Sequence, residues 1–219
     1  MTTITVAGEA ESIHTAEVAT AHLTVSIDGP DRDVVLSRAG GVHSVVLAGL
    51  EVLQSAATPA VASHSSDRVH VTAQRPWNAD GAQLDLVYTA SAGIRAEFTD
   101  IDALSSWLGQ VATLDGVEIP SIEWSLTRQT RESARAAAQR DAVAAAIRSA
   151  EVYAESLGLA TVTAVAIGDA GLLGIEPGPA GQPKLAAAMR SADMSAGGFA
   201  LRPGDITVSA SVHARFEAS

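Results

Sequence analysis

Cysteine is absent from the 219 residues, and basic residues are scarce. Without cysteine the chain cannot form disulfide bonds, use a thiolate nucleophile or bind zinc through sulfur. The 14 Lys and Arg residues are outnumbered by 25 Asp and Glu residues, so the formal net charge is −11. A surface of that sign repels phosphate groups, and we therefore expect no binding to nucleic acid.

The sequence also lacks the pattern of a secretory leader and a long uninterrupted apolar run. The first six residues, Met1 to Val6, read as the start of a strand and contain no basic segment followed by apolar residues. The longest apolar stretch, about 157–168, is too short to span a bilayer and ends at Asp169. We expect a cytoplasmic protein without membrane insertion.

Motifs for catalysis and cofactor binding are missing as well. The glycines at 168, 171 and 174 do not form a dinucleotide fingerprint, and no phosphate-binding loop or serine-nucleophile motif occurs. Glu151 and Glu155 lie one helical turn apart beside Arg148, which is typical of a solvated charged face. The sequence thus predicts no catalytic residues and no cofactor.

The six histidines are scattered, without the short spacings of metal ligands. His22, His70 and His213 fall on outward-facing strand positions, and three imidazoles from neighbouring strands could bind zinc. Solvated histidines without a metal are far more common. We therefore expect no metal site.

Apolar residues make up 47% of the chain, enough for a sizeable core. Alternation of apolar and polar residues indicates strands at the N-terminus and at 21–27, 69–73, 84–98, 122–126, 162–167 and 206–216. Steps of three and four indicate a helix over 35–53, capped by Asp31, and a shorter one capped by Asp100 or Asp102. Gly40 and Gly41 inside the first helix cost about 1 kcal/mol each, which packing would have to offset.

A third helix, about 130–157, is long and rich in alanine. Gly158 is expected to end it, and its narrow apolar face is expected to comprise Ala136, Val143, Ile147, Ala150, Ala154 and Leu157. Residues from about 168 to 198 are rich in Gly, Pro, Ala and Ser and are expected to form a flexible loop. The element order predicts an α+β fold in which antiparallel or mixed sheets are backed by helices. Each half pairs strands with a helix, which allows two similar sub-domains, 1–115 and 116–219.

Four stretches resemble the SIMPL-domain (YggE-like) family in their order and spacing over nearly the whole chain. They are the first strand, Ile4 to Ala10; the central strand Leu84 to Ala90, which contains a Y-x-A pattern; the alanine-spaced helix 134–158, which ends in Leu157-Gly158; and the last strand, Pro203 to Val212, which reads P-G-x-I-x-V-S-A-x-V. Each pattern is that of a core element or a turn, so the resemblance lies in the series and not in one motif.

The resemblance implies one α+β domain over residues 1–219, in a family whose members tend to form large homo-oligomers. It also implies a link to oxidative-stress defence in bacteria, and it assigns no catalytic residues. We accordingly expect a self-assembling protein that is not an enzyme and that acts in stress protection. The alternative is a binding module with a pocket for a small ligand or peptide at subunit interfaces.

Three residues are candidates for subunit contacts. Trp77 is an indole in the polar loop 76–81, where it either folds back on the sheet or anchors another subunit. Ala150 and Ala154 lie on the small-residue stripe of the long helix, which would let another element approach closely. We predict a homo-oligomer of closed symmetry, with contacts through this stripe and the 168–198 loop.

Overall fold

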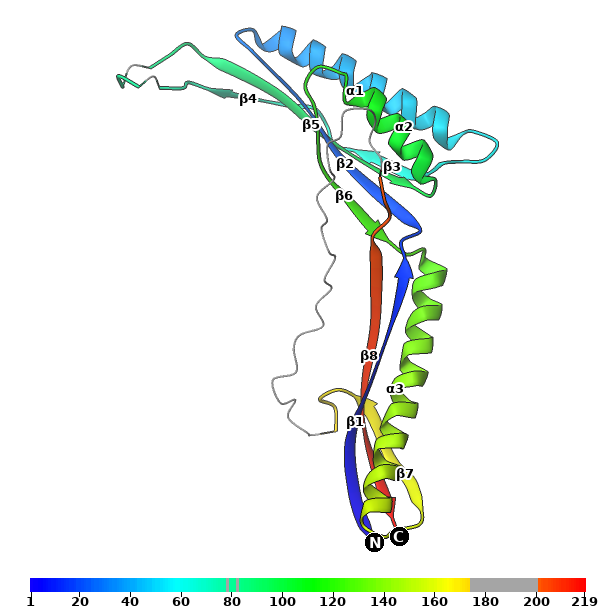
Figure 1. Ribbon diagram of the computed structural model, residues 1–219. Helices are drawn as coiled ribbons and strands as arrows, with labels where there is room; N and C mark the ends of the chain where they lie inside the picture. Colours follow the sequence, from blue (N-terminus) through cyan, green and yellow to red (C-terminus); the bar gives the residue numbers. More distant parts are fainter. Residues whose placement is uncertain (78, 82, 174–200) are drawn as a thin grey trace. The chain divides into compact units, whose positions relative to one another are not determined.

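A computed structural model describes residues 1–77, 79–81, 83–173 and 201–219 (Figure 1). Its elements are β1 (Thr2–Thr15), β2 (Val18–Gly29), α1 (Arg32–Gln54), β3 (Val61–Ser66), β4 (His70–Gln74), β5 (Val87–Phe98), α2 (Ile101–Val111), β6 (Val117–Ser125), α3 (Arg128–Ser156), β7 (Val162–Asp169) and β8 (Asp205–Ala218). Every described strand pair is antiparallel. The predicted α+β class, with one long alanine-rich helix, is confirmed.

The described residues divide into two compact units. Unit 1 contains 1–15, 126–173 and 205–219, and unit 2 contains 16–125 and 201–204. This division differs from the halves 1–115 and 116–219, because unit 1 joins both ends of the chain through the pairing of β1 with β8. Most of the loop expected at 168–198 lies outside the described residues, and β7 extends to Asp169.

Unit 1 is a three-stranded sheet in the order β1-β8-β7, with α3 lying along β1 and β8 (Figure 1). The register of β1 and β8 runs without a break from Thr2 opposite Ala218 to Thr15 opposite Asp205. Alternate residues in the second half of β8, from Val212 to Ala218, are buried against α3, and those in the first half are partly exposed on the same face, as the sequence pattern predicts. Gly158, with φ of +72°, follows the last turn of α3, which confirms the predicted helix end.

The buried stripe of α3 differs from the predicted one. The buried residues are all alanines at every fourth position: Ala134, Ala138, Ala142, Ala146, Ala150 and Ala154. Ile147 is 38% exposed and Leu157 is 61% exposed, so two large side chains expected inside lie outside. Four residues turn an α-helix by about 400°, so the stripe advances by about 40° per step and can follow the twisted strands beneath it. Small side chains bring the helix close to the sheet.

Unit 2 is a sheet in the order β3-β5-β2-β6, with β4 also paired to β5. Helices α1 and α2 cover one face of this sheet (Figure 1), and their apolar residues pack on those of β2 and β5. Asp31 caps α1 by accepting hydrogen bonds from the backbone N–H groups of Asp33 and Val34, at 2.9 and 3.0 Å. Asp100 caps α2 by accepting one from Ala103 at 2.9 Å. Both predicted caps are confirmed, and Asp100 is the residue used of the two considered.

Three features of unit 2 depart from the sequence analysis. Strand β3 was not expected, and β5 begins at Val87 instead of residue 84. Added Cβ atoms at Gly40 and Gly41 would meet nothing within 4 Å, so no close packing offsets these glycines. Helix α1 is also, among the described helices, the one long and apolar enough to cross a membrane by length and composition. Core helices pass the same test, and α1 packs in the unit-2 core through Val35, Ala39, Val46 and Leu50.

Candidate functional site

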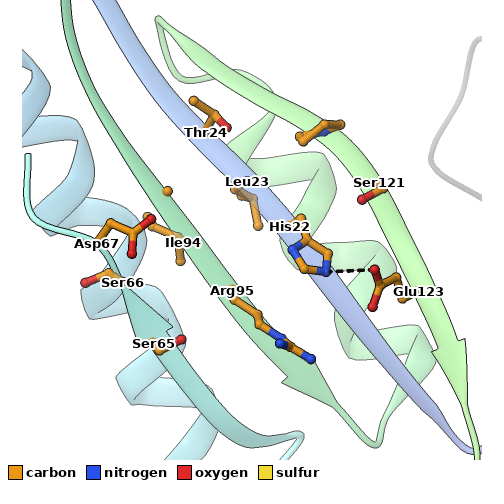
Figure 2. A pocket seen from close by; sticks show the side chains of 12 residues that line it. His22, Leu23, Thr24, Ser65, Ser66, Asp67, Ile94, Arg95, Ser121 and Glu123 are labelled. Atoms are coloured by element: carbon orange, nitrogen blue, oxygen red, sulfur yellow. Dashed lines mark ion pairs between the residues drawn. The ribbon is translucent and has the colours of Figure 1, made fainter.

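A polar groove of about 500 Å³ lies on the unit-2 sheet, on the face opposite α1 and α2 (Figure 2). Alternation along the strands creates it, because the apolar residues of β2 face the helices and the residues between them face the groove. Its lining comes from four strands and the segment after β3: His22, Leu23, Thr24, Ser65, Ser66, Asp67, Gly93, Ile94, Arg95, Pro120, Ser121 and Glu123.

The middle of the groove is one row of residues that crosses the sheet. Ser65 of β3 is paired with Arg95 of β5, Arg95 with His22 of β2, and His22 with Ser121 of β6. Directly opposite residues in an antiparallel sheet project from the same face. The row therefore sets one guanidinium beside one imidazole, with a hydroxyl group at each end.

His22 is a partly buried polar residue of the row. Its Nε2 atom lies 3.5 Å from Oε1 of Glu123, which is long for a hydrogen bond. The same nitrogen is shielded from solvent and makes no hydrogen bond within the described residues. The floor of the groove therefore contains a polar atom whose hydrogen-bonding capacity is not used.

Asp67 is held over the sheet by its contacts with Gly93. The backbone N–H of Asp67 donates a hydrogen bond to the carbonyl oxygen of Gly93 at 2.9 Å. A Cβ atom added at Gly93 would lie 2.7 Å from Oδ2 of Asp67. The carboxylate thus occupies the space that any larger residue at position 93 would fill, and the absence of a side chain there lets it lie in the groove.

The charges of the groove are only partly paired. Among the described residues, neither Arg95 nor Asp67 forms an ion pair, and Figure 2 shows the Arg95 side chain directed away from Asp67. No described hydrogen bond joins a serine of the groove to His22, so the observed contacts do not assemble a nucleophile with a base. The groove therefore offers hydrogen-bonding groups and three charged side chains, Arg95, Asp67 and Glu123, of which Glu123 lies beside His22.

The residues named from the sequence as subunit contacts lie elsewhere. Trp77 is 66% exposed, and its backbone forms an isolated antiparallel bridge with Gln83. Ala150 and Ala154 are 0% and 2% exposed because α3 packs them on the unit-1 sheet. These two alanines belong to the core of their own chain, and in this arrangement they present no surface to another one.

The histidines proposed as a zinc trio are separated. His22 and His70 belong to unit 2 and His213 to unit 1. His70 lies 3.1 Å from the Ser91 hydroxyl oxygen, and Nδ1 of His213 accepts a hydrogen bond from the Gly171 backbone N–H at 3.3 Å. Within the described ranges, no three metal-binding side chains converge.

The charged residues of α3 lie at the surface. Glu151, Glu155 and Arg148 are all exposed, which is the solvated charged face that their spacing indicates.

Comparison with known families matches nearly the entire chain. The model of one family covers residues 4–216, and its description is "SIMPL: Protein of unknown function (DUF541)". No curated protein matches the chain. Because the match extends over both units and all but four of the strand residues at the two ends of the chain, the chain belongs to the SIMPL family.

Proposed function

We propose that this SIMPL-family chain is a self-assembling protein, not an enzyme, and that copies associate through the outer edge of β1. The proposal rests on the unpaired backbone groups along that edge. Strand β1 is 14 residues long and stands at the end of the unit-1 sheet, where β8 is its one described partner. Its unpaired backbone groups form a template for another strand.

The other sheet edges carry features that hinder such pairing. Strand β6 contains Pro120, which cannot donate a backbone hydrogen bond. Strand β7 is 8 residues long and has a register shift between Ala164 and Ala166. The opposite edge of unit 2 is divided between two short strands, β3 and β4. Edges of these kinds are typical of strands that stay unpaired.

Strand β1 has none of these protective features. It contains no proline, lysine or arginine, and its register with β8 is unbroken. Two β1 strands related by a twofold axis would pair antiparallel and cover each other's edge. Such an interface uses the same surface on both chains and closes on itself, which limits growth into filaments.

The proposed physiological setting is protection against stress, as the family resemblance implies. The chain has no cysteine, so any protection against oxidants would not use a thiol of this protein. Self-assembly offers a structural route to such a role. Comparing the oxidant sensitivity of cells that carry the natural chain with cells that carry an assembly-defective variant would test the connection.

The assembly itself is tested with lysines on the exposed face of unit 1. Thr5→Lys with Ala7→Lys places two charges on the β1 edge strand, and Ser209→Lys with Ser211→Lys places the same two charges on the central strand β8. We expect the natural chain and the β8 variant to have at least twice the 22.3 kDa chain mass by light scattering. The β1 variant is expected to shift towards 22.3 kDa. Equal masses for the two variants would exclude the β1 edge as the interface.

A further inference from the structure

We infer that the groove of unit 2 binds a small zwitterion, a short peptide, with its carboxylate at Arg95 and its ammonium group at Asp67. This site is independent of the proposed assembly, because all of its lining residues belong to unit 2 and the β1 edge belongs to unit 1. The groove volume of about 500 Å³ lies within the range of small-molecule sites.

The separation of the two charges favours a ligand that carries both signs. Arg95 and Asp67 share the groove, yet neither forms an ion pair with the other or with another described residue. A purely anionic ligand would meet the carboxylates of Asp67 and Glu123, and a purely cationic ligand would meet Arg95. A zwitterion can place each of its charges beside the opposite one.

The positions of the two residues suit a ligand of this size. Arg95 of β5 is paired with Ser65, and Asp67, which directly follows β3, is bonded to Gly93, so the two charged residues occupy neighbouring rows on this face of the sheet. The backbones of diagonal neighbours of this kind are about 7–8 Å apart in antiparallel sheets, and the Arg95 side chain extends away from Asp67, so the two charged groups lie farther apart than the backbone positions (Figure 2). An extended dipeptide carries its two charges at opposite ends and suits such a separation, whereas a single amino acid carries both charges on one carbon.

Each end of the ligand finds additional hydrogen-bonding groups. The planar guanidinium of Arg95 can donate two parallel hydrogen bonds to a carboxylate. Its row neighbours Ser65 and His22 supply a hydroxyl group and an imidazole. Near Asp67, Thr24 is paired with Gly93 and lines the groove, and its hydroxyl can accept from an ammonium group.

The test uses calorimetric titration of the full chain with the dipeptide Ala-Ala, free alanine, N-acetyl-Ala-Ala and Ala-Ala-amide. We expect Ala-Ala to bind more tightly than alanine, and loss of either charge of Ala-Ala to weaken binding about tenfold or more. Analogues that bind as well as the zwitterion would overturn the inference. Absence of binding by all four compounds at millimolar concentration would overturn it too.

Two substitutions assign the ends of the ligand. Arg95→Gln is expected to remove the preference for Ala-Ala over its amide while keeping the preference over the N-acetyl form, and Asp67→Asn is expected to do the reverse. Gly93→Ala is a third variant that alters no charge. Its new methyl group must displace the Asp67 carboxylate from its position in the groove. It should weaken Ala-Ala binding as Asp67→Asn does. Arg215→Gln in unit 1 is the control, and it should bind like the natural chain.

Discussion

Gly8 of β1 lies so close to Ala146 of α3 that a Cβ atom on residue 8 would come within 2.8 Å of the Ala146 Cβ. It would also collide with the backbone carbonyl of Ala142 and approach the Ala146 nitrogen. Backbone atoms cannot move aside as the end of a side chain can. The closeness of α3 to the sheet therefore depends on glycine and alanine at this point of contact.

Gly8→Ala should destabilise unit 1 by about 1–3 kcal/mol, since overpacking forces the helix and the strand apart. Denaturant unfolding measured by circular dichroism gives the free energy of unfolding. Gly168→Ala is the matched control, because its added Cβ would meet side-chain atoms at ordinary distances of 3.5 to 3.6 Å. A Gly8→Ala variant as stable as Gly168→Ala would show that α3 and β1 are not in close contact.

Ala150→Leu should also destabilise the chain by about 1–3 kcal/mol, because Ala150 is fully buried between α3 and the unit-1 sheet. Val152→Leu also enlarges an apolar side chain of α3, by one methylene group at a position that is 59% exposed, and should have little effect. Thermal unfolding of both variants compares them. If Ala150→Leu left stability intact and altered only the assembled mass, Ala150 would be a subunit contact after all.

The fold was predictable wherever a local pattern decides the structure. The alternation of β2 and β8, the capping residues Asp31 and Asp100, and the end of α3 before Gly158 all follow from short-range chemistry. The stripe of α3 did not follow, because large apolar residues were assumed to be buried. Alanine is buried instead, since the distance between helix and sheet leaves room only for a methyl group. Strand β3 is polar and exposed in most positions, so it has no apolar pattern to detect.

The groove could not be predicted from the sequence because it depends on register between distant segments. His22 is visible as an outward-facing residue, but its pairing with Arg95 becomes evident only when β2 and β5 are aligned. Asp67 lies outside any regular strand, and its place in the groove depends on the missing side chain at Gly93. The one signal in the sequence was the alternation of polar with apolar residues along β2 and β5.

Gly41→Ala should stabilise the chain by about 0.5–1 kcal/mol. Gly41 lies inside α1, and an added Cβ atom would meet nothing within 4 Å, so alanine gains helix propensity without a clash. Denaturant unfolding measures the gain, and light scattering on the same samples reports the assembled mass. A loss of stability or of assembled mass would mean that another chain packs against this part of α1.

Asp31→Ala should destabilise the chain by about 0.5–2 kcal/mol, because it removes the acceptor of two backbone hydrogen bonds at the start of α1. Asp28→Ala removes an equal charge from an exposed position at the end of β2 and is the control. The difference in unfolding free energy isolates the cap from the effect of charge. No difference between the two would contradict the capping role.

Trp77 remains a predicted subunit anchor, and its exposure makes this testable by fluorescence. Trp77 is 66% exposed in the single chain, whereas Trp107 is 3% exposed beside Phe98. In a chain with Trp107→Phe and Trp124→Phe, the remaining emission should shift to shorter wavelength as concentration rises and copies associate. Emission that stays at the wavelength of a solvated indole at every concentration would remove Trp77 from the interface.

The pairing of β1 strands is tested most directly by measuring distances between copies. Because the chain has no cysteine, single spin labels can be placed through Thr3→Cys, Ala7→Cys and Glu11→Cys, all on one face of β1. In an antiparallel twofold pair, each strand advances by about 3.3 Å per residue. When the label is moved four residues away from the axis, both labels move outward, so the distance between them increases by about 26 Å. Electron–electron double resonance should therefore give distances that change steeply with label position. Distances that are the same at all three positions, or no distance between copies at all, would contradict assembly through β1.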